Sequence, residues 1–170
     1  MGKGWPIGFL VRENLSKKLD FDSFVEFFAS QKLISPTYIS ICGVEENEGV
    51  IITRNRLTEE HRRSFKGKYL YLLQTNQDWW IRDPSINLIH SKERKIFLSS
   101  LLDLHYSQNE SITPLKLWES YSSFPVWNHE TIYTTLMIPH LSFCKTLINF
   151  KDPIEKNNYK EQLKKDLQYL

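Results

Sequence analysis

The hydrophobic pattern changes its period at Pro36, and this change restricts the fold more than any other feature. Before Pro36, apolar residues recur at the i, i+3, i+4 and i+7 spacing of one helix face, at Phe21, Phe24, Val25 and Phe28. After Pro36, residues 37–42 and 50–53 are rich in β-branched and aromatic side chains. Two such runs around a glycine-bounded acidic loop predict an antiparallel hairpin.

A helix is predicted over residues 23–35. Ser23 and Glu26 have the spacing of a capping box, in which two side chains of the first turn bond each other's backbone N–H groups. The helix should end before Pro36, because a proline disfavours the α conformation at the residue that precedes it. Residues 5–19 predict a short helical or irregular start of the chain.

The middle of the chain predicts a connection, a third strand and a long loop. Residues 54–68 are polar and basic, which is typical of a solvated connection. Residues 69–75 are almost continuously apolar, as in a strand that is buried on both faces. Residues 76–91 have no period and contain Pro84, so they predict a loop.

The second half predicts two helices and a strand pair. Residues 92–104 have leucines at helical spacing, and Thr113-Pro114 places a capping residue before a proline at the first helical position. Residues 131–138 and 141–150 read as two strands. Helices and strands segregated in this way indicate an α+β fold, with helices on one face of an antiparallel sheet.

Length and composition indicate one globular domain and exclude several classes of protein. The chain has 170 residues, of which 41% are apolar and 14% aromatic, unlike a disordered chain. The net charge of +2 is far from the strong positive charge typical of nucleic-acid-binding proteins, so we do not expect nucleic acid as a partner. The sequence contains no run of about 18 apolar residues, so we expect no transmembrane segment. The first residues of the sequence do not resemble a signal peptide. We expect a domain over residues 1–152 and a charged tail over 153–170.

The sequence contains few motifs that carry chemistry. Cys42 and Cys144 lack the close pairing of zinc ligands, and no motif indicates a metal or a cofactor, so we expect neither. Asn14 and Asn109 each begin an N-x-S pattern, which makes them glycosylation candidates. Asn76 follows a predicted strand and precedes an acid and two tryptophans. This arrangement fits a strand exit with aromatic packing or a polar site.

Four longer segments occur in one order along the chain. They are W-P-I-G-F-L-V-R at 5–12, E-G-V-I-I-T-R-N-R at 48–56, Q-T-N-Q-D-W-W at 74–80 and P-V-W-N-H-E-T-I-Y-T-T-L-M at 125–137. Together they resemble the C-terminal part of the acid ceramidase and N-acylethanolamine acid amidase family, over the chain up to about residue 151. The resemblance implies part of a four-layer αββα sandwich of the N-terminal-nucleophile class.

The resemblance also implies a reaction and its residues. In this family a cysteine at the N-terminus of the processed enzyme attacks a fatty amide, and water then hydrolyses the acyl-enzyme. Asn76 matches the family asparagine that donates to the oxyanion. Arg94, in the K-E-R-K-I segment, is the counterpart of a family arginine near the site. The resemblance further implies a ceramide or N-acylethanolamine substrate and a lysosomal or secreted location.

The family nucleophile lies upstream of the segment that matches residues 5–12, so we expect residues 1–170 to lack it. Neither Cys42 nor Cys144 can replace it, because neither is an N-terminal residue. Two interpretations remain open. The chain is either the C-terminal (β-subunit) part of a fatty amide hydrolase, inactive until an N-terminal portion completes it, or a non-catalytic relic or scaffold that binds a lipid or a partner.

Overall fold

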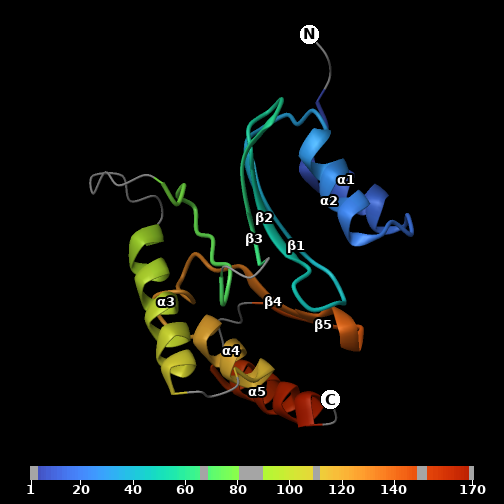
Figure 1. The fold of residues 1–170 in the computed structure, drawn as a ribbon. Helices are drawn as coiled ribbons and strands as arrows, with labels where there is room; N and C mark the ends of the chain where they lie inside the picture. Colours follow the sequence, from blue (N-terminus) through green and yellow to red (C-terminus); the bar gives the residue numbers. More distant parts are fainter. Residues whose placement is uncertain (1–3, 66–68, 81–89, 109–111, 149–152, 169–170) are drawn as a thin grey trace. The chain divides into compact units, whose positions relative to one another are not determined.

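The computed structural model describes residues 4–65, 69–80, 90–108, 112–148 and 153–168. These residues form two compact units, Met1–Gln74 and Thr75–Leu170. Each unit has helices, antiparallel strands and a hydrophobic core of its own, which confirms the predicted α+β class (Figure 1). None of the described helices is both long and apolar enough to cross a membrane.

The first unit packs two helices on one face of a three-stranded sheet. The helices are α1 (Ile7–Leu15) and α2 (Phe21–Ser30), and the strands β1 (Thr37–Cys42), β2 (Gly49–Arg54) and β3 (Glu59–Ser64) run antiparallel in the order β1-β2-β3. The predicted hairpin is therefore confirmed, with Ile39 opposite Ile52. These two residues pack with Leu10, Val25 and Phe28 of the helices in one core.

Helix α2 begins and ends earlier than the sequence predicted. Its cap is Asp20, whose Oδ1 accepts from the Ser23 backbone N–H at 2.8 Å, so the predicted capping box led by Ser23 is wrong. A carboxylate caps a helix as well as a hydroxyl does, and its negative charge suits the N-terminal end of the helix dipole. The helix ends at Ser30 because the next residues pair elsewhere: Leu33 N–H donates to the Arg56 carbonyl and Ile34 N–H to the Trp5 carbonyl.

Two predictions about the third strand are wrong. The strand is β3, within the segment that was predicted to be a solvated connection, and residues 69–75 form no strand. The polar sequence E-E-H-R-R-S of β3 is held by pairing with β2 and by ion pairs of Arg62 with Glu59 and Glu26. Apolar character alone does not make a strand, because the backbone also needs a neighbouring strand to bond.

The second unit places helices α4 and α5 against a two-stranded sheet. It contains α3 (Ser91–Ser107), α4 (Pro114–Tyr121), β4 (Tyr133–Ile138), the short 3-10 helix η2 (Pro139–Leu141), β5 (Phe143–Ile148) and α5 (Pro153–Gln168). The predicted helices and strand pair are confirmed, and Thr113 caps α4 as expected by accepting from the Lys116 N–H. The core gathers Trp118, Trp127, Leu136, Leu147 and Leu163.

The C-terminal segment that was predicted to be a charged tail forms helix α5. Leu163 is fully buried in the second core. Lys145 of β5 forms an ion pair with Asp166 at 2.7 Å, and the Tyr159 hydroxyl donates to the Thr146 carbonyl at 2.6 Å. Helix α5 thus belongs to the second unit, which spans Thr75–Leu170. The predicted domain over residues 1–152 stays a prediction.

Candidate functional site

Asn76 lies in a turn at the start of the second unit. The chain leaves buried Leu73 and turns through residues 76–80, where the rings of Trp79 and Trp80 meet edge to face with centroids 5.8 Å apart. The Asn76 side chain is exposed. The turn therefore presents an amide to solvent beside two aromatic rings.

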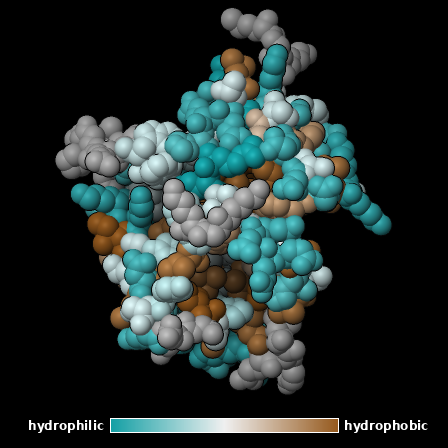
Figure 2. Space-filling model, in the orientation of Figure 1, coloured by the Kyte–Doolittle hydropathy of each residue, from teal (hydrophilic) through white to brown (hydrophobic). Residues whose placement is uncertain are grey.

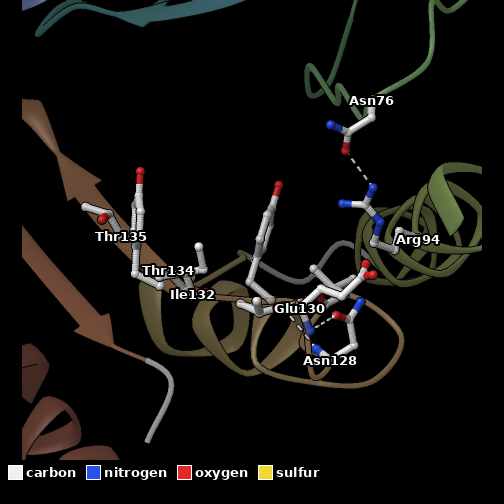
Figure 3. Close-up of a pocket in the computed structure, with 11 residues that line it drawn as sticks. Asn76, Arg94, Asn128, Glu130, Ile132, Thr134 and Thr135 are labelled. Atoms are coloured by element: carbon white, nitrogen blue, oxygen red, sulfur yellow. Dashed lines mark hydrogen bonds between the residues drawn. The ribbon is translucent and has the colours of Figure 1, made fainter. Parts of the chain in front are cut away.

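Helix α3 brings Arg94 to this amide. Arg94 Nη2 donates to Asn76 Oδ1 at 2.7 Å and lies 3.4 Å from the hydroxyl of buried Ser91 (Figure 3). Arg94 lies in the first turn of α3, where the helix dipole disfavours a cation. The helix terminus thus gives this cation no electrostatic stabilisation, whereas the Asn76 oxygen does. Two residues separated by 18 positions in the sequence are joined by one hydrogen bond.

The hydrogen bond decides which way the Asn76 amide faces. A guanidinium only donates, so the amide atom that faces Arg94 must be the oxygen. The Asn76 nitrogen is then turned away from Arg94, as Figure 3 shows. Among the described residues no acceptor is found for this nitrogen. Asn76 Nδ2 is therefore a positioned donor that a ligand oxygen can use.

Asn76 and Arg94 border a cavity of about 500 Å³ within the second unit. Its other walls come from Tyr121 at the end of α4, from the loop before β4 and from the start of β4. The loop is held by a local turn, in which Asn128 Oδ1 accepts from the Glu130 N–H at 2.8 Å and the Asn128 N–H donates to Thr131 Oγ1 at 3.0 Å. This turn places the Glu130 side chain at the cavity (Figure 3).

The lining of the cavity includes one cationic side chain, Arg94, and one anionic side chain, Glu130. Arg94 is half-buried with its Nε buried and without a partner, whereas Glu130 is exposed. Burial raises the pKa of Tyr121, so its hydroxyl stays protonated at neutral pH and can donate. The cavity therefore offers donors from Asn76, Arg94 and Tyr121, which suit a ligand that carries an oxygen acceptor.

The remaining residues singled out from the sequence lie elsewhere. Asn14 is fully buried and its Nδ2 donates to the Leu10 carbonyl at 2.8 Å, so the folded unit leaves no room for a glycan there. Asn109 lies outside the described residues. Cys42 and Cys144 are exposed free thiols, and neither lines the cavity. Desolvation, and then the Glu48 carboxylate, raise the pKa of the Cys42 thiol, which is the opposite of nucleophile activation.

Sequence reasoning did not single out Tyr121, Glu130 or the threonines of β4 as site residues. Glu130, Thr134 and Thr135 do fall within the P-V-W-N-H-E-T-I-Y-T-T-L-M segment that carries the resemblance. That segment gave no role for them, because their common place at one cavity depends on the turn at Asn128. In the part of the chain that the structure describes, no group of three His, Cys, Asp or Glu residues could hold a metal ion.

Comparisons with known proteins show similarity to N-acylethanolamine-hydrolyzing acid amidases and to acid ceramidases. No protein-family model matches the sequence. The N-acylethanolamine-hydrolyzing acid amidase of Caenorhabditis elegans is 28% identical over 138 residues, which are 80% of this chain and 36% of that protein. The acid ceramidase of Balaenoptera acutorostrata scammoni is 26% identical over 133 residues, 77% of this chain and 32% of that protein.

A solved structure agrees with these matches. The Caenorhabditis elegans N-acylethanolamine-hydrolyzing acid amidase ortholog matches with a TM-score of 0.68 and 26% identity, over 86% of this chain and 62% of that one. The predicted N-terminal-nucleophile hydrolase fold is thereby confirmed. The chain spans about a third of the length of the curated relatives it matches. In sequence and in fold, it belongs to the acid ceramidase and N-acylethanolamine-hydrolyzing acid amidase family.

Proposed function

We propose that this chain provides the oxyanion-stabilising part of a hydrolase that cleaves fatty acid amides such as ceramides or N-acylethanolamines. The observation that carries the proposal is the hydrogen bond from Arg94 to Asn76, which turns an amide N–H donor toward solvent at a cavity. Support for the substrate class comes from the relatives, which are named as an acid ceramidase and as N-acylethanolamine-hydrolyzing amidases.

The chemistry assigned to Asn76 is the stabilisation of charge on the carbonyl oxygen. When a nucleophile attacks an amide carbonyl, negative charge develops on that oxygen, and a donor already in place needs no reorganisation. One such donor commonly changes the rate by about 10² to 10³, or about 3 kcal/mol of barrier. Arg94 acts here as a positioning residue, because it holds the Asn76 oxygen and so aims the nitrogen.

The attacking thiolate is assigned to a segment that residues 1–170 do not include, as the family resemblance implies. Two observations favour this assignment: no cysteine lines the cavity, and the pKa of the Cys42 thiol is raised. The polypeptide of residues 1–170 is accordingly expected to bind an acyl compound without hydrolysing an amide. A lysosomal or secreted location, implied by the resemblance, stays a prediction.

The same two observations favour a second candidate, a non-catalytic scaffold that binds a lipid. The two candidates differ in one measurable property. A scaffold needs only affinity for its ligand, whereas an oxyanion site binds the transition state more tightly than the ground state and therefore accelerates the reaction.

An external nucleophile makes the difference measurable in the polypeptide of residues 1–170. In a Cys42→Ser, Cys144→Ser background, 2-mercaptoethanol thiolate attacks the carbonyl of p-nitrophenyl hexanoate, forms a thioester and releases p-nitrophenolate, which is followed by its absorbance. The protein should accelerate this thiolysis over the reaction without protein. Asn76→Ala should lower that acceleration about 100-fold, and should abolish it where the wild-type acceleration is smaller than 100-fold.

The matched control is Asn158→Ala, which removes an exposed carboxamide of α5 and should leave the acceleration unchanged. Acceleration that survives Asn76→Ala, or none at all, contradicts the oxyanion role and leaves the scaffold. Hydrolysis of a fluorogenic fatty amide by the unmodified polypeptide, with an acyl adduct on Cys42 or Cys144, contradicts the external nucleophile.

A further inference from the structure

Glu130 is a carboxylate on the wall of the Asn76–Arg94 cavity, and the proposed function does not use it. Among the described residues, its side chain forms no hydrogen bond and no ion pair. Hydrophilic residues are common at the surface, as the teal areas of Figure 2 show, so exposure alone does not single out Glu130. Its place at a cavity that also contains a cation and two tyrosines does single it out.

We infer that Glu130 binds the ammonium group of a substrate whose amine part is cationic, such as the fatty amide of a diamine. The inference rests on the proposed function, because it places the amide carbonyl of the same molecule at Asn76. Such an amide has an acceptor oxygen at its carbonyl and a positive charge a few carbon atoms away, on the amine side. The cavity offers the complementary groups, with donors at Asn76 and Arg94 and a carboxylate at Glu130.

A local turn holds the backbone from which Glu130 projects. The Glu130 N–H donates to Asn128 Oδ1 at 2.8 Å, and Asn128 Nδ2 donates to the Pro125 carbonyl at 3.1 Å. The Thr131 N–H donates to the Asn128 carbonyl, also at 3.1 Å. In the view of Figure 3, Glu130 lies on the opposite side of the cavity from Asn76. The turn therefore sets the place of the carboxylate before a ligand arrives, which lowers the entropy cost of binding.

The two charges of the cavity do not pair with each other. Arg94 and Glu130 both line it, but among the described residues they form no ion pair, and Arg94 Nη2 donates to Asn76 instead. Both charges therefore remain available to a ligand. A ligand with its carbonyl oxygen near Arg94 and its cation at Glu130 pairs both of them, whereas the reverse orientation brings like charges together.

A neutral hydroxyl is the other group that Glu130 could bind, because a carboxylate also accepts from an O–H. Tyr121 and Tyr133, which line the same cavity, favour the ammonium. The face of an aromatic ring attracts a cation within about 6 Å of its centre. The charge of an ammonium is thus attracted by the carboxylate and by the rings, whereas a hydroxyl gains a hydrogen bond alone.

The experiment titrates the polypeptide of residues 1–170 with N-substituted butanamides that differ only in their substituent. The substituent has an ethylene, propylene or butylene spacer, and each spacer ends in an ammonium, a hydroxyl or a methyl group. Binding is followed by NMR, at the side-chain amide of Asn76 and at the backbone N–H of Glu130. For at least one spacer, the ammonium compound should bind about tenfold more tightly than the hydroxyl and methyl compounds of the same length.

Glu130→Gln keeps the shape of the side chain and removes its charge. It should reduce the preference for the ammonium compound about fivefold and leave the dissociation constants of the methyl compounds unchanged. Glu119→Gln is the matched control: it removes a negative charge from an exposed side chain of α4 that does not line the cavity, so the preference should stay as in the wild type. Raising the salt concentration from about 20 mM to about 0.5 M should weaken the wild-type preference, because salt screens the exposed Glu130 charge.

The outcomes separate this inference from the proposed function. Binding of the neutral amides that Asn76→Ala abolishes, combined with no preference for any ammonium compound, overturns the role of Glu130 and keeps that of Asn76. A preference that is equally large in Glu130→Gln and in the wild type also overturns the role of Glu130. Amide binding that Asn76→Ala leaves intact overturns the proposed function and the placement of the carbonyl with it. The absence of binding by every compound overturns both.

Discussion

Replacing Arg54 tests how the first unit is held together. Arg54 is 1% exposed on β2, and its guanidinium reaches across to the end of α2. Nη1 donates to the Phe28 carbonyl at 2.8 Å and to the Ala29 carbonyl, and Nη2 donates to the Gln31 carbonyl. The last four carbonyls of a helix have no partner within the helix, and a cation there also suits the helix dipole.

The expected loss for Arg54→Met is about 3 kcal/mol of unfolding free energy. Hydrogen bonds from a charged donor contribute about 1.5–3 kcal/mol each, and a buried acceptor left unpaired costs about 1–3 kcal/mol. The variant has no guanidinium to desolvate on folding, which offsets part of that sum, since burying a guanidinium is itself unfavourable. Arg54→Lys keeps the charge but loses the forked geometry, so we expect roughly half the loss.

Urea denaturation followed by circular dichroism measures the loss, and hydrogen exchange at Ile39 and Ile52 locates it in the first unit. Arg56→Met is the matched control, because the Arg56 side chain is exposed and only its backbone carbonyl is bonded. A change of less than about 0.5 kcal/mol in Arg54→Met, which is the usual range for surface substitutions, would refute the capping role.

Three further predictions concern caps and docking. Leu163→Ala should destabilise the second unit by about 2–5 kcal/mol in thermal denaturation, because Leu163 is fully buried, and an unchanged melting curve would mean that α5 is not docked. The hydrogen bond and charge of Lys145 lower the pKa of Asp166, so this pair stabilises the fold above the unfolded carboxyl pKa of about 3.9 and is lost as pH falls through the lowered value. The melting temperature of Asp166→Asn should therefore fall less between neutral and acidic pH than the melting temperature of the wild type. Parallel plots of melting temperature against pH for the two proteins would contradict this. Asp20→Ala should lower the melting temperature of the first unit more than Ser23→Ala does, because Asp20 is the acceptor at the helix cap, and the reverse order would restore the capping box.

Local patterns predicted the elements whose cause is local. The strand pair over β1 and β2 follows from β-branched residues around a short loop, and the Thr113-Pro114 start of α4 follows from side chains next to each other in sequence. Both need only near neighbours along the chain. The strand β3 could not be found in this way, because E-E-H-R-R-S is a strand by virtue of its neighbour β2 and of the ion pairs of Arg62.

The site divides in the same way. The segment Q-T-N-Q-D-W-W and the K-E-R-K-I segment indicated Asn76 and Arg94 separately, through resemblance to a family. Nothing in either segment states that the two side chains meet, or that the amide oxygen faces the guanidinium. The role of Arg54 was equally hidden, since an arginine in an apolar strand gives no indication that the end of a helix lies within its reach.

The amino-acid order by itself determined the α+β class, because that class depends on the period of the hydrophobic pattern. The resemblance of four segments to a known family indicated the family, and through it predicted Asn76 and Arg94 as site residues. Only the tertiary structure decided the direction of the Asn76 amide, the burial of Asn14 and the docking of α5. These properties depend on distances between residues far apart in the chain. A hydrogen bond or a packed side chain requires contact in space, which spacing along the sequence does not specify.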